Sequence, residues 1–173
     1  MLDLIIKNGS SYIDGELNNQ NIGIKDGNIV EIGKIENDSI NILDATNLTV
    51  LPGCIDTQVH FREPGSTDAE DLNSGSRAAI AGGITSVFEM PNTNPPTSSK
   101  KEFYNKLKLA KNRMYCNYAF YFGATPDNHK ELSELKDSEG CCGIKLFAGS
   151  STGNLLVNKE EDIEKVFQNS SKI

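Results

Sequence analysis

Long hydrophobic runs are absent from this sequence of 173 residues, and their absence bears on where the protein works. No stretch reaches the length of about 20 apolar residues that a membrane-spanning helix needs. The N-terminus, MLDLIIKNGS, carries an acid at Asp3 and only a short apolar stretch, which fits neither a signal peptide nor a membrane anchor. We therefore expect a cytoplasmic protein with no membrane partner.

Clusters of basic residues are also absent. The chain has 17 Lys and Arg residues against 24 Asp and Glu residues, which gives a formal net charge of -7 at pH 7. Binding to a phosphate backbone depends on basic side chains that displace its counterions, and no part of this sequence gathers them. We therefore expect no nucleic-acid partner.

Cysteine is scarce and is not arranged for metal or redox chemistry. The four cysteines form neither a C-x-x-C pair nor a zinc-finger spacing. They are Cys54, Cys116, Cys141 and Cys142. We expect them to be buried, reduced thiols without a role in function.

The residues that are present favour a globular protein that begins with β structure. Hydrophobic residues make up 37% of the chain and charged residues 24%, which is enough apolar material for a core. In residues 1–51, short strand-like runs are separated by turn signals, among them Asp14-Gly15 and Asp26-Gly27. An Asp-Gly step between two apolar runs is a strong hairpin signal. We predict that residues 1–51 form a small all-β, sandwich-like segment.

After Pro52 the pattern changes, because strand-like runs alternate with helical ones. Strands are predicted at residues 55–62, 84–90, 115–122 and 142–147. Helix starts are predicted at Thr67-x-x-Glu70, Ser99-x-x-Glu102, Thr125-Pro126 and Asn158-x-x-Glu161, and Gly82-Gly83 predicts the end of the first helix.

Four β-then-α units in succession imply a parallel sheet with helices outside it. A complete eight-fold barrel takes roughly 250 residues. We therefore predict an α/β fold in which residues 52–173 form the first four units, the N-terminal half, of a TIM-type (β/α) barrel.

One strand of this pattern, IDTQVHFREPG, is unusual in its polar residues. Asp56, Gln58, His60 and Arg62 occupy alternate positions, so on a strand they share one face. In a parallel barrel such a face points to the interior, and ligand sites gather at the carboxyl ends of the strands.

Two further polar residues are expected at the same end of the sheet. Asn92 follows the second predicted strand, and Lys145 lies within the fourth. Each candidate also has a plainer interpretation. Asn92 could stabilise a turn, Lys145 could lie on a solvated strand edge, and Arg62 could bridge Glu63 or Glu70 instead of holding a substrate carboxylate. A lysine among apolar neighbours has a lowered pKa and can react with carbon dioxide to form a carbamate, an anionic metal ligand.

Three segments carry a family resemblance: LPGCIDTQVHFREPG, EDLNSGSRAAIAGGITSVFEMPNTNPPT and GIKLFAGSSTGNLL. Through them, nearly the whole chain resembles the dihydroorotase branch of the metal-dependent amidohydrolases. The most specific parts are H-F-R-E-P-G and M-P-N-T. The resemblance implies a hydrolase that cleaves a cyclic amide C–N bond and interconverts dihydroorotate and N-carbamoyl-aspartate in pyrimidine biosynthesis.

The resemblance also implies roles for individual residues. His60 matches a metal ligand of the first strand, and Lys145 lies where many relatives have a carboxylated lysine that bridges two metal ions. Arg62 and Asn92 match the residues that hold the carboxylate of a small cyclic amide. The implied cofactor is zinc, as one or two ions.

The chain departs from the family pattern in two respects. Gln58 stands where the usual His-x-His pattern has its first histidine, and an amide is a poorer zinc ligand than imidazole, so Gln58 is a doubtful ligand. The catalytic aspartate, a general acid and base, and the further histidines belong to later strands, which we expect beyond residue 173. No catalytic residue is therefore assigned here, and we expect the 173 residues alone to be inactive.

Two other functions remain open. Gln58 motivates a non-catalytic, dihydroorotase-like scaffold, which would bind another enzyme of pyrimidine synthesis. A hydrolase of the allantoinase or hydantoinase type would keep the chemistry and act on a different ring, in which case Arg62 would not be needed to hold a carboxylate. Separately, an unclosed half-barrel leaves a strand edge unpaired, so we expect the isolated chain to be poorly soluble or to form a homo-oligomer.

Overall fold

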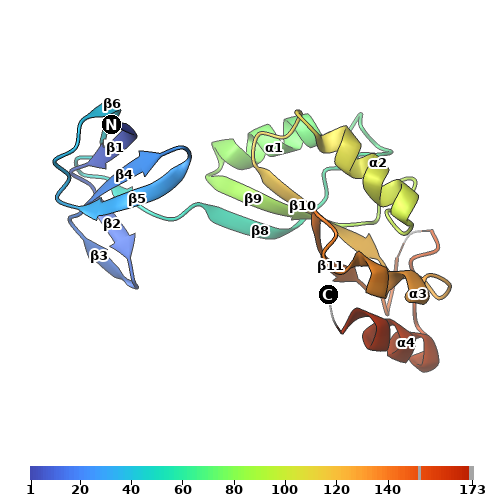
Figure 1. Ribbon diagram of the computed structural model, residues 1–173. Coiled ribbons are helices and arrows are strands. Elements are labelled where there is room, and N and C mark those ends of the chain that lie inside the picture. The colour runs from blue at the N-terminus through green and yellow to red at the C-terminus, as the bar shows by residue number, and fades with distance from the viewer. Residues whose placement is uncertain (152, 172–173) are drawn as a thin grey trace. The chain divides into compact units, whose positions relative to one another are not determined.

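A computed structural model describes residues 1–151 and 153–171 of the chain. The chain divides into two compact units, Met1–Pro52 and Gly53–Ile173, each of which is described by itself (Figure 1).

The first unit consists of two small β-sheets. A four-stranded sheet has the order β5-β4-β1-β6, and a three-stranded sheet has the order β3-β2-β7. The strands are β1 (Leu2–Lys7), β2 (Ser10–Ile13), β3 (Glu16–Asn18), β4 (Asn21–Lys25), β5 (Asn28–Gly33), β6 (Ser39–Asp44) and β7 (Thr49–Val50). Leu2, Ile5 and Ile22 are buried between them. The all-β character that the sequence predicts is confirmed.

Both predicted hairpins are present in this unit. β2 pairs antiparallel with β3 across Asp14-Gly15, and β4 pairs antiparallel with β5 across Asp26-Gly27. All four turn residues have positive φ, between 50° for Asp26 and 88° for Gly15. Two successive residues of positive φ make the turn whose twist matches that of the flanking strands, which is why the Asp-Gly step forms a tight hairpin.

The second unit is built on a four-stranded parallel sheet with the order β11-β10-β9-β8 (Figure 1). Its strands are β8 (Cys54–Val59), β9 (Ile84–Glu89), β10 (Asn117–Gly123) and β11 (Cys141–Lys145). Its helices are α1 (Leu72–Ala81), α2 (Lys100–Ala110), α3 (His129–Leu132) with the 3₁₀ turn η1 (Ser133–Leu135), and α4 (Glu160–Ser170). The predicted α/β half-barrel is therefore confirmed.

Aromatic and aliphatic side chains hold the helices against this sheet. Phe120 and Phe122 of β10 are fully buried, and so are Phe103 of α2 and Leu132 of α3. Burying a side chain of this size contributes roughly 1.5–3 kcal/mol. Among the described residues, no helix combines the length and the apolar character that crossing a membrane requires.

The first helix of this unit begins later than the sequence predicts. Asp71 precedes α1 and accepts a hydrogen bond from the Ser74 backbone N–H at 2.7 Å, while the Ser74 hydroxyl accepts one from the Asp71 N–H at 3.1 Å. The predicted start at Thr67 and Glu70 is wrong, because the stretch before Asp71 forms turns in which Ala69 N donates to Ser66 O. The helix ends at Gly82-Gly83 as predicted.

Of the other three predicted helix starts, one is confirmed and two are wrong. Ser99 caps α2 as predicted, because its hydroxyl accepts a hydrogen bond from Glu102 N at 3.2 Å. The start predicted at Thr125 is wrong, since the Thr125 hydroxyl accepts from the N–H groups of two following residues and so closes a turn before α3. The start predicted at Asn158 is also wrong, because α4 follows Lys159 without a side-chain cap.

Candidate active site

The predicted site residues lie at the carboxyl end of the parallel sheet, but not on one strand face. β8 ends at Val59, which pairs with Glu89 and accepts a hydrogen bond from Met90 N at 3.0 Å. Gln58 is within the strand, whereas His60 and Arg62 follow it. The alternation predicted through Arg62 is wrong because the chain leaves the sheet after Val59, and Arg62 has a left-handed φ of 59°.

The segments after β8 and β9 nevertheless bring His60, Arg62 and Asn92 together, with Lys145 close enough to act on His60. Burial lowers the pKa of His60, and the positive charges of Arg62 and Lys145 lower it further. The Asn92 side chain favours the protonated imidazole and so raises the pKa. The net effect is a lowered pKa, which keeps the imidazole neutral at neutral pH.

This electrostatic arrangement gives a direct prediction. Arg62→Met should raise the pKa of His60, and Lys145→Met should raise it less, because Arg62 is the stronger of the two charges acting on the ring. The measurement is an NMR pH titration of the imidazole C–H resonances. Lys108→Met, which removes an exposed charge on α2, is the control and should leave the titration unchanged. An unchanged His60 pKa in both test variants would contradict the arrangement.

Arg62 and Asn92 line one cavity of about 350 Å³. The cavity residues are Arg62, Pro64, Ser66, Asn92, Thr93, Asn94, Pro96 and Gly153. Asn92 Oδ1 is buried and forms no hydrogen bond of acceptable geometry with the described residues, although the Asn92 side chain lies close enough to His60 to raise the pKa of the imidazole. A buried acceptor without a partner is unfavourable unless a ligand supplies a donor.

Arg62 also lacks an ion-pair partner among the described residues. Within residues 1–151 and 153–171, no carboxylate forms an ion pair with Arg62. Glu63, which the sequence suggests as a partner, instead binds Arg113. The plainer interpretation of Arg62 as a bridge to Glu63 or Glu70 is therefore wrong.

Lys145 and Gln58 lie outside this cavity. Lys145 ends β11, where its backbone oxygen accepts a hydrogen bond from Ala124 N at 2.9 Å, and its ammonium group is 5.2 Å from the centre of the Phe147 ring. Gln58 is exposed on β8, and its backbone N–H donates to Asp56. Among the described residues, no hydrogen bond joins the Gln58 side chain to the rest of the site.

Beneath the site lies a buried ion pair that sequence reasoning missed. Lys106 of α2 and Glu89 of β9 are in contact, and their side chains are 0% and 1% exposed. Lys106 Nζ also donates to Met90 O at 3.2 Å. Burial raises the pKa of Glu89 from 4.5 to about 7 and lowers that of Lys106. Two signals could have found the pair: a single acid in the apolar strand GITSVFEM, and a lysine three residues after Phe103 on the buried face of a helix.

A second missed residue, Asn128, connects the loops around the site. Its side-chain oxygen accepts from Thr125 N at 2.8 Å, and its amide nitrogen donates to Ser98 O at 2.8 Å and to Gly123 O at 2.9 Å. Asn128 is 7% exposed. Its three hydrogen bonds therefore lie in the protein interior, where the three backbone groups would otherwise lack a partner. The ends of β10 and of the segment after β9 are held together in this way.

The described residues offer few ligands for zinc. The lowered pKa of His60 favours the neutral imidazole, which is the form that binds a metal. Lys145 would need conversion to a carbamate, and Gln58 offers only an exposed amide. No group of three or more His, Cys, Asp or Glu side chains in the described ranges could hold a metal ion. On their own these residues do not fit catalytic zinc, which takes three protein ligands.

Comparison with known proteins agrees with this fold. The profile of the amidohydrolase family matches residues 49–168. A dihydroorotase of Methanosarcina acetivorans is 40% identical over 162 residues, which are 92% of this chain and 34% of that protein. An allantoinase of Escherichia coli O1:K1 is 36% identical over 162 residues, which are 93% of this chain and 36% of the allantoinase.

A solved structure gives the same result for the fold. The L-hydantoinase of Arthrobacter aurescens superposes with a TM-score of 0.86 at 28% identity, over 97% of this chain and 38% of the hydantoinase. The chain spans roughly a third of the length of the curated relatives it matches.

Proposed function

Since the chain belongs to the amidohydrolase family, we propose that it works in a cyclic amidohydrolase whose ring substrate carries a carboxylate, as dihydroorotate does. The reaction is hydrolysis of the cyclic amide C–N bond, or its reverse. The observation that carries the choice of substrate is the cavity in which Arg62 and Asn92 meet.

The two side chains complement different parts of such a ring. The guanidinium of Arg62 has the planar, two-pronged donor geometry that matches a carboxylate, and no carboxylate of the described residues occupies it. Asn92 Oδ1 is an acceptor without a donor, which a ring N–H would satisfy. A carboxylate beside a ring N–H, as in dihydroorotate, supplies both groups.

The metal part of the proposal concerns His60 and Lys145. We propose zinc as the cofactor, with His60 as a direct ligand, Lys145 as a second after carboxylation, and the remaining ligands from outside the described residues. His60, kept neutral by burial and by Arg62, is in the right protonation state for that role.

Arg62→Met tests the choice of substrate. We expect KM for dihydroorotate to rise roughly 10- to 100-fold, because a hydrogen-bonded charge contributes about 1.5–3 kcal/mol. Turnover of a neutral ring, such as hydantoin or allantoin, should change little. The measurement is steady-state kinetics of the full-length protein with the carboxylated and the neutral ring. Arg77→Met is the control, because it removes an exposed arginine of α1 whose guanidinium lies 5.8 Å from the centre of the Tyr115 ring and does not line the cavity.

The alternatives predict different results. An allantoinase or hydantoinase would prefer the neutral ring before any substitution and would tolerate Arg62→Met. A scaffold would turn over neither ring and would carry no stoichiometric zinc in elemental analysis. Unchanged kinetics with dihydroorotate in the Arg62→Met variant would remove the argument for a carboxylated ring.

A further inference from the structure

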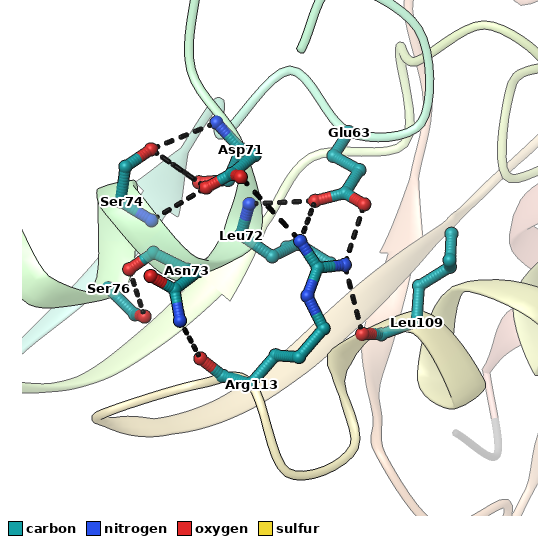
Figure 2. A network of polar contacts seen from close by, with 8 residues as sticks. All are labelled: Glu63, Asp71, Leu72, Asn73, Ser74, Ser76, Leu109 and Arg113. Atoms are coloured by element: carbon teal, nitrogen blue, oxygen red, sulfur yellow. Dashed lines mark hydrogen bonds and ion pairs between the residues drawn. The ribbon is translucent and has the colours of Figure 1, made fainter.

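The residue after Arg62 is anchored in the protein interior. Glu63 is 7% exposed, and its carboxylate is bound from two sides (Figure 2). Arg113 donates to Oε1 at 2.7 Å and to Oε2 at 3.0 Å, and the backbone N–H of Leu72 donates to Oε2 at 2.9 Å. The segment after β8 is thereby joined to the start of α1 and to the turn that follows α2.

Arg113 is itself held in place. Its guanidinium donates to Leu109 O at 3.3 Å and lies 3.6 Å from an oxygen of Asp71. Its backbone oxygen accepts from the Asn73 side chain at 3.1 Å (Figure 2). The backbone oxygen of Arg113 is bonded to α1 and its guanidinium is bonded to α2. Because Arg113 is held at both places, it can determine where the Glu63 carboxylate lies.

Arg62 needs such support. A left-handed residue with a Cβ atom costs roughly 1–2 kcal/mol, and Arg62 has a φ of 59°. Its backbone oxygen accepts from Ser66 N at 3.0 Å, and Pro64 O accepts from Asn94 N at 2.9 Å. The backbone around Arg62 is therefore fixed, while Arg62, which is one of the residues that line the cavity, has no ion-pair partner among the described residues.

We propose that Arg113 is a positioning residue, which acts through Glu63 to hold the Arg62 guanidinium at the cavity where the substrate carboxylate would bind. The inference rests on the proposed function and extends it to a residue outside the cavity. The two-pronged contact of Arg113 fixes Glu63, and Glu63 is covalently adjacent to Arg62. A displacement of about 1 Å at a binding group can reduce kcat/KM by as much as 100-fold.

The test is Arg113→Lys in the full-length protein, which keeps the charge but loses the two-pronged contact. With dihydroorotate, KM should rise roughly 10-fold or more while kcat changes less than threefold. KM for a neutral ring should stay unchanged. Amide hydrogen exchange at Ser66 and Asn94 should become faster, because their N–H groups bond to the Arg62–Pro64 backbone. Arg77→Lys on α1 is the matched control and should change none of these readouts.

Glu63→Gln provides a second variant should Arg113→Lys fold poorly. The amide still accepts from Leu72 N but cannot form the charged pair with Arg113, so the same rise in KM is expected. A merely structural role would lower the melting temperature and the active fraction but leave KM and the two amides unchanged, and that outcome overturns the proposal.

The exchange experiment separates this proposal from the proposed function. If the wild-type protein turns over no cyclic amide, the proposed function fails, and the exchange rates of Ser66 and Asn94 still decide whether Arg113 holds the Arg62 segment. If the wild-type protein turns over dihydroorotate and Arg113→Lys changes neither KM nor exchange, the proposed function stands and the positioning role is wrong.

Discussion

Lys106→Met is expected to lower the free energy of unfolding by about 3–5 kcal/mol at pH 8, because it leaves Glu89 buried without its partner. Both side chains of the pair are at most 1% exposed. A buried carboxylate can then avoid its charge only by binding a proton. The loss should appear as a fall in melting temperature of roughly 10 °C.

The loss of unfolding free energy should be smaller at pH 5 than at pH 8, because the pKa of Glu89 is raised in the folded chain. Burial raises this pKa from 4.5 to about 7, so between these values the folded chain holds a proton that the unfolded chain releases. The stabilisation that comes from this bound proton is complete below pH 4.5 and is lost as the pH rises through about 7. Removing Lys106 raises the folded-state pKa further, so the difference from wild type grows toward pH 8.

Urea unfolding at pH 5 and pH 8 checks this prediction. Lys108→Met, which removes an exposed lysine of the same helix, is the matched control and should lie within about 0.5 kcal/mol of wild type. The double variant Glu89→Gln, Lys106→Met leaves no buried charge and should recover most of the loss. Wild-type stability of Lys106→Met at both pH values would show that the pair is not buried as described.

Asn128→Ala should have the second largest effect, a loss on the order of 3 kcal/mol. The substitution removes three hydrogen bonds and leaves Thr125 N, Ser98 O and Gly123 O without the partner they now have. Each buried backbone group that loses its partner costs about 1–3 kcal/mol. Urea unfolding gives the total, and amide exchange at Thr125 should become faster.

Asn105→Ala is the control for this experiment. Asn105 is exposed on α2, and the hydrogen bond from its side chain to Glu102 is long at 3.5 Å. Alanine favours a helix more than asparagine does, so this variant should be as stable as wild type or slightly more stable. Equal stability losses in the two variants would mean that Asn128 does not connect the loops around the site.

The architecture was accessible from the sequence because it depends on local signals. The hairpins follow from Asp-Gly steps that require positive φ, and the parallel sheet follows from the alternation of strand and helix patterns. Helix starts were less accessible, because several hydrogen-bonding side chains competed near each start. Asp71 is used where Thr67 was predicted, since its carboxylate reaches Ser74 N at 2.7 Å.

The site was partly accessible for a similar reason. His60, Arg62 and Asn92 could be predicted because each comes near the end of a strand of one parallel sheet. The end of β8 at Val59 could not, because it depends on pairing with β9. The contact between Glu63 and Arg113 joins residues 50 positions apart, and no local pattern predicts which of several charged partners a buried glutamate selects.

The residues that line the cavity are not the residues that form the hydrophobic core of the sheet. Except for Gly153, all the lining residues belong to the two connections that follow β8 and β9. The hydrophobic side chains that assemble the sheet, such as Phe120 and Phe122, lie elsewhere. Under the proposed function, ring selection is thus encoded mainly in two short connections, and evolution can alter it without rebuilding the scaffold that carries them.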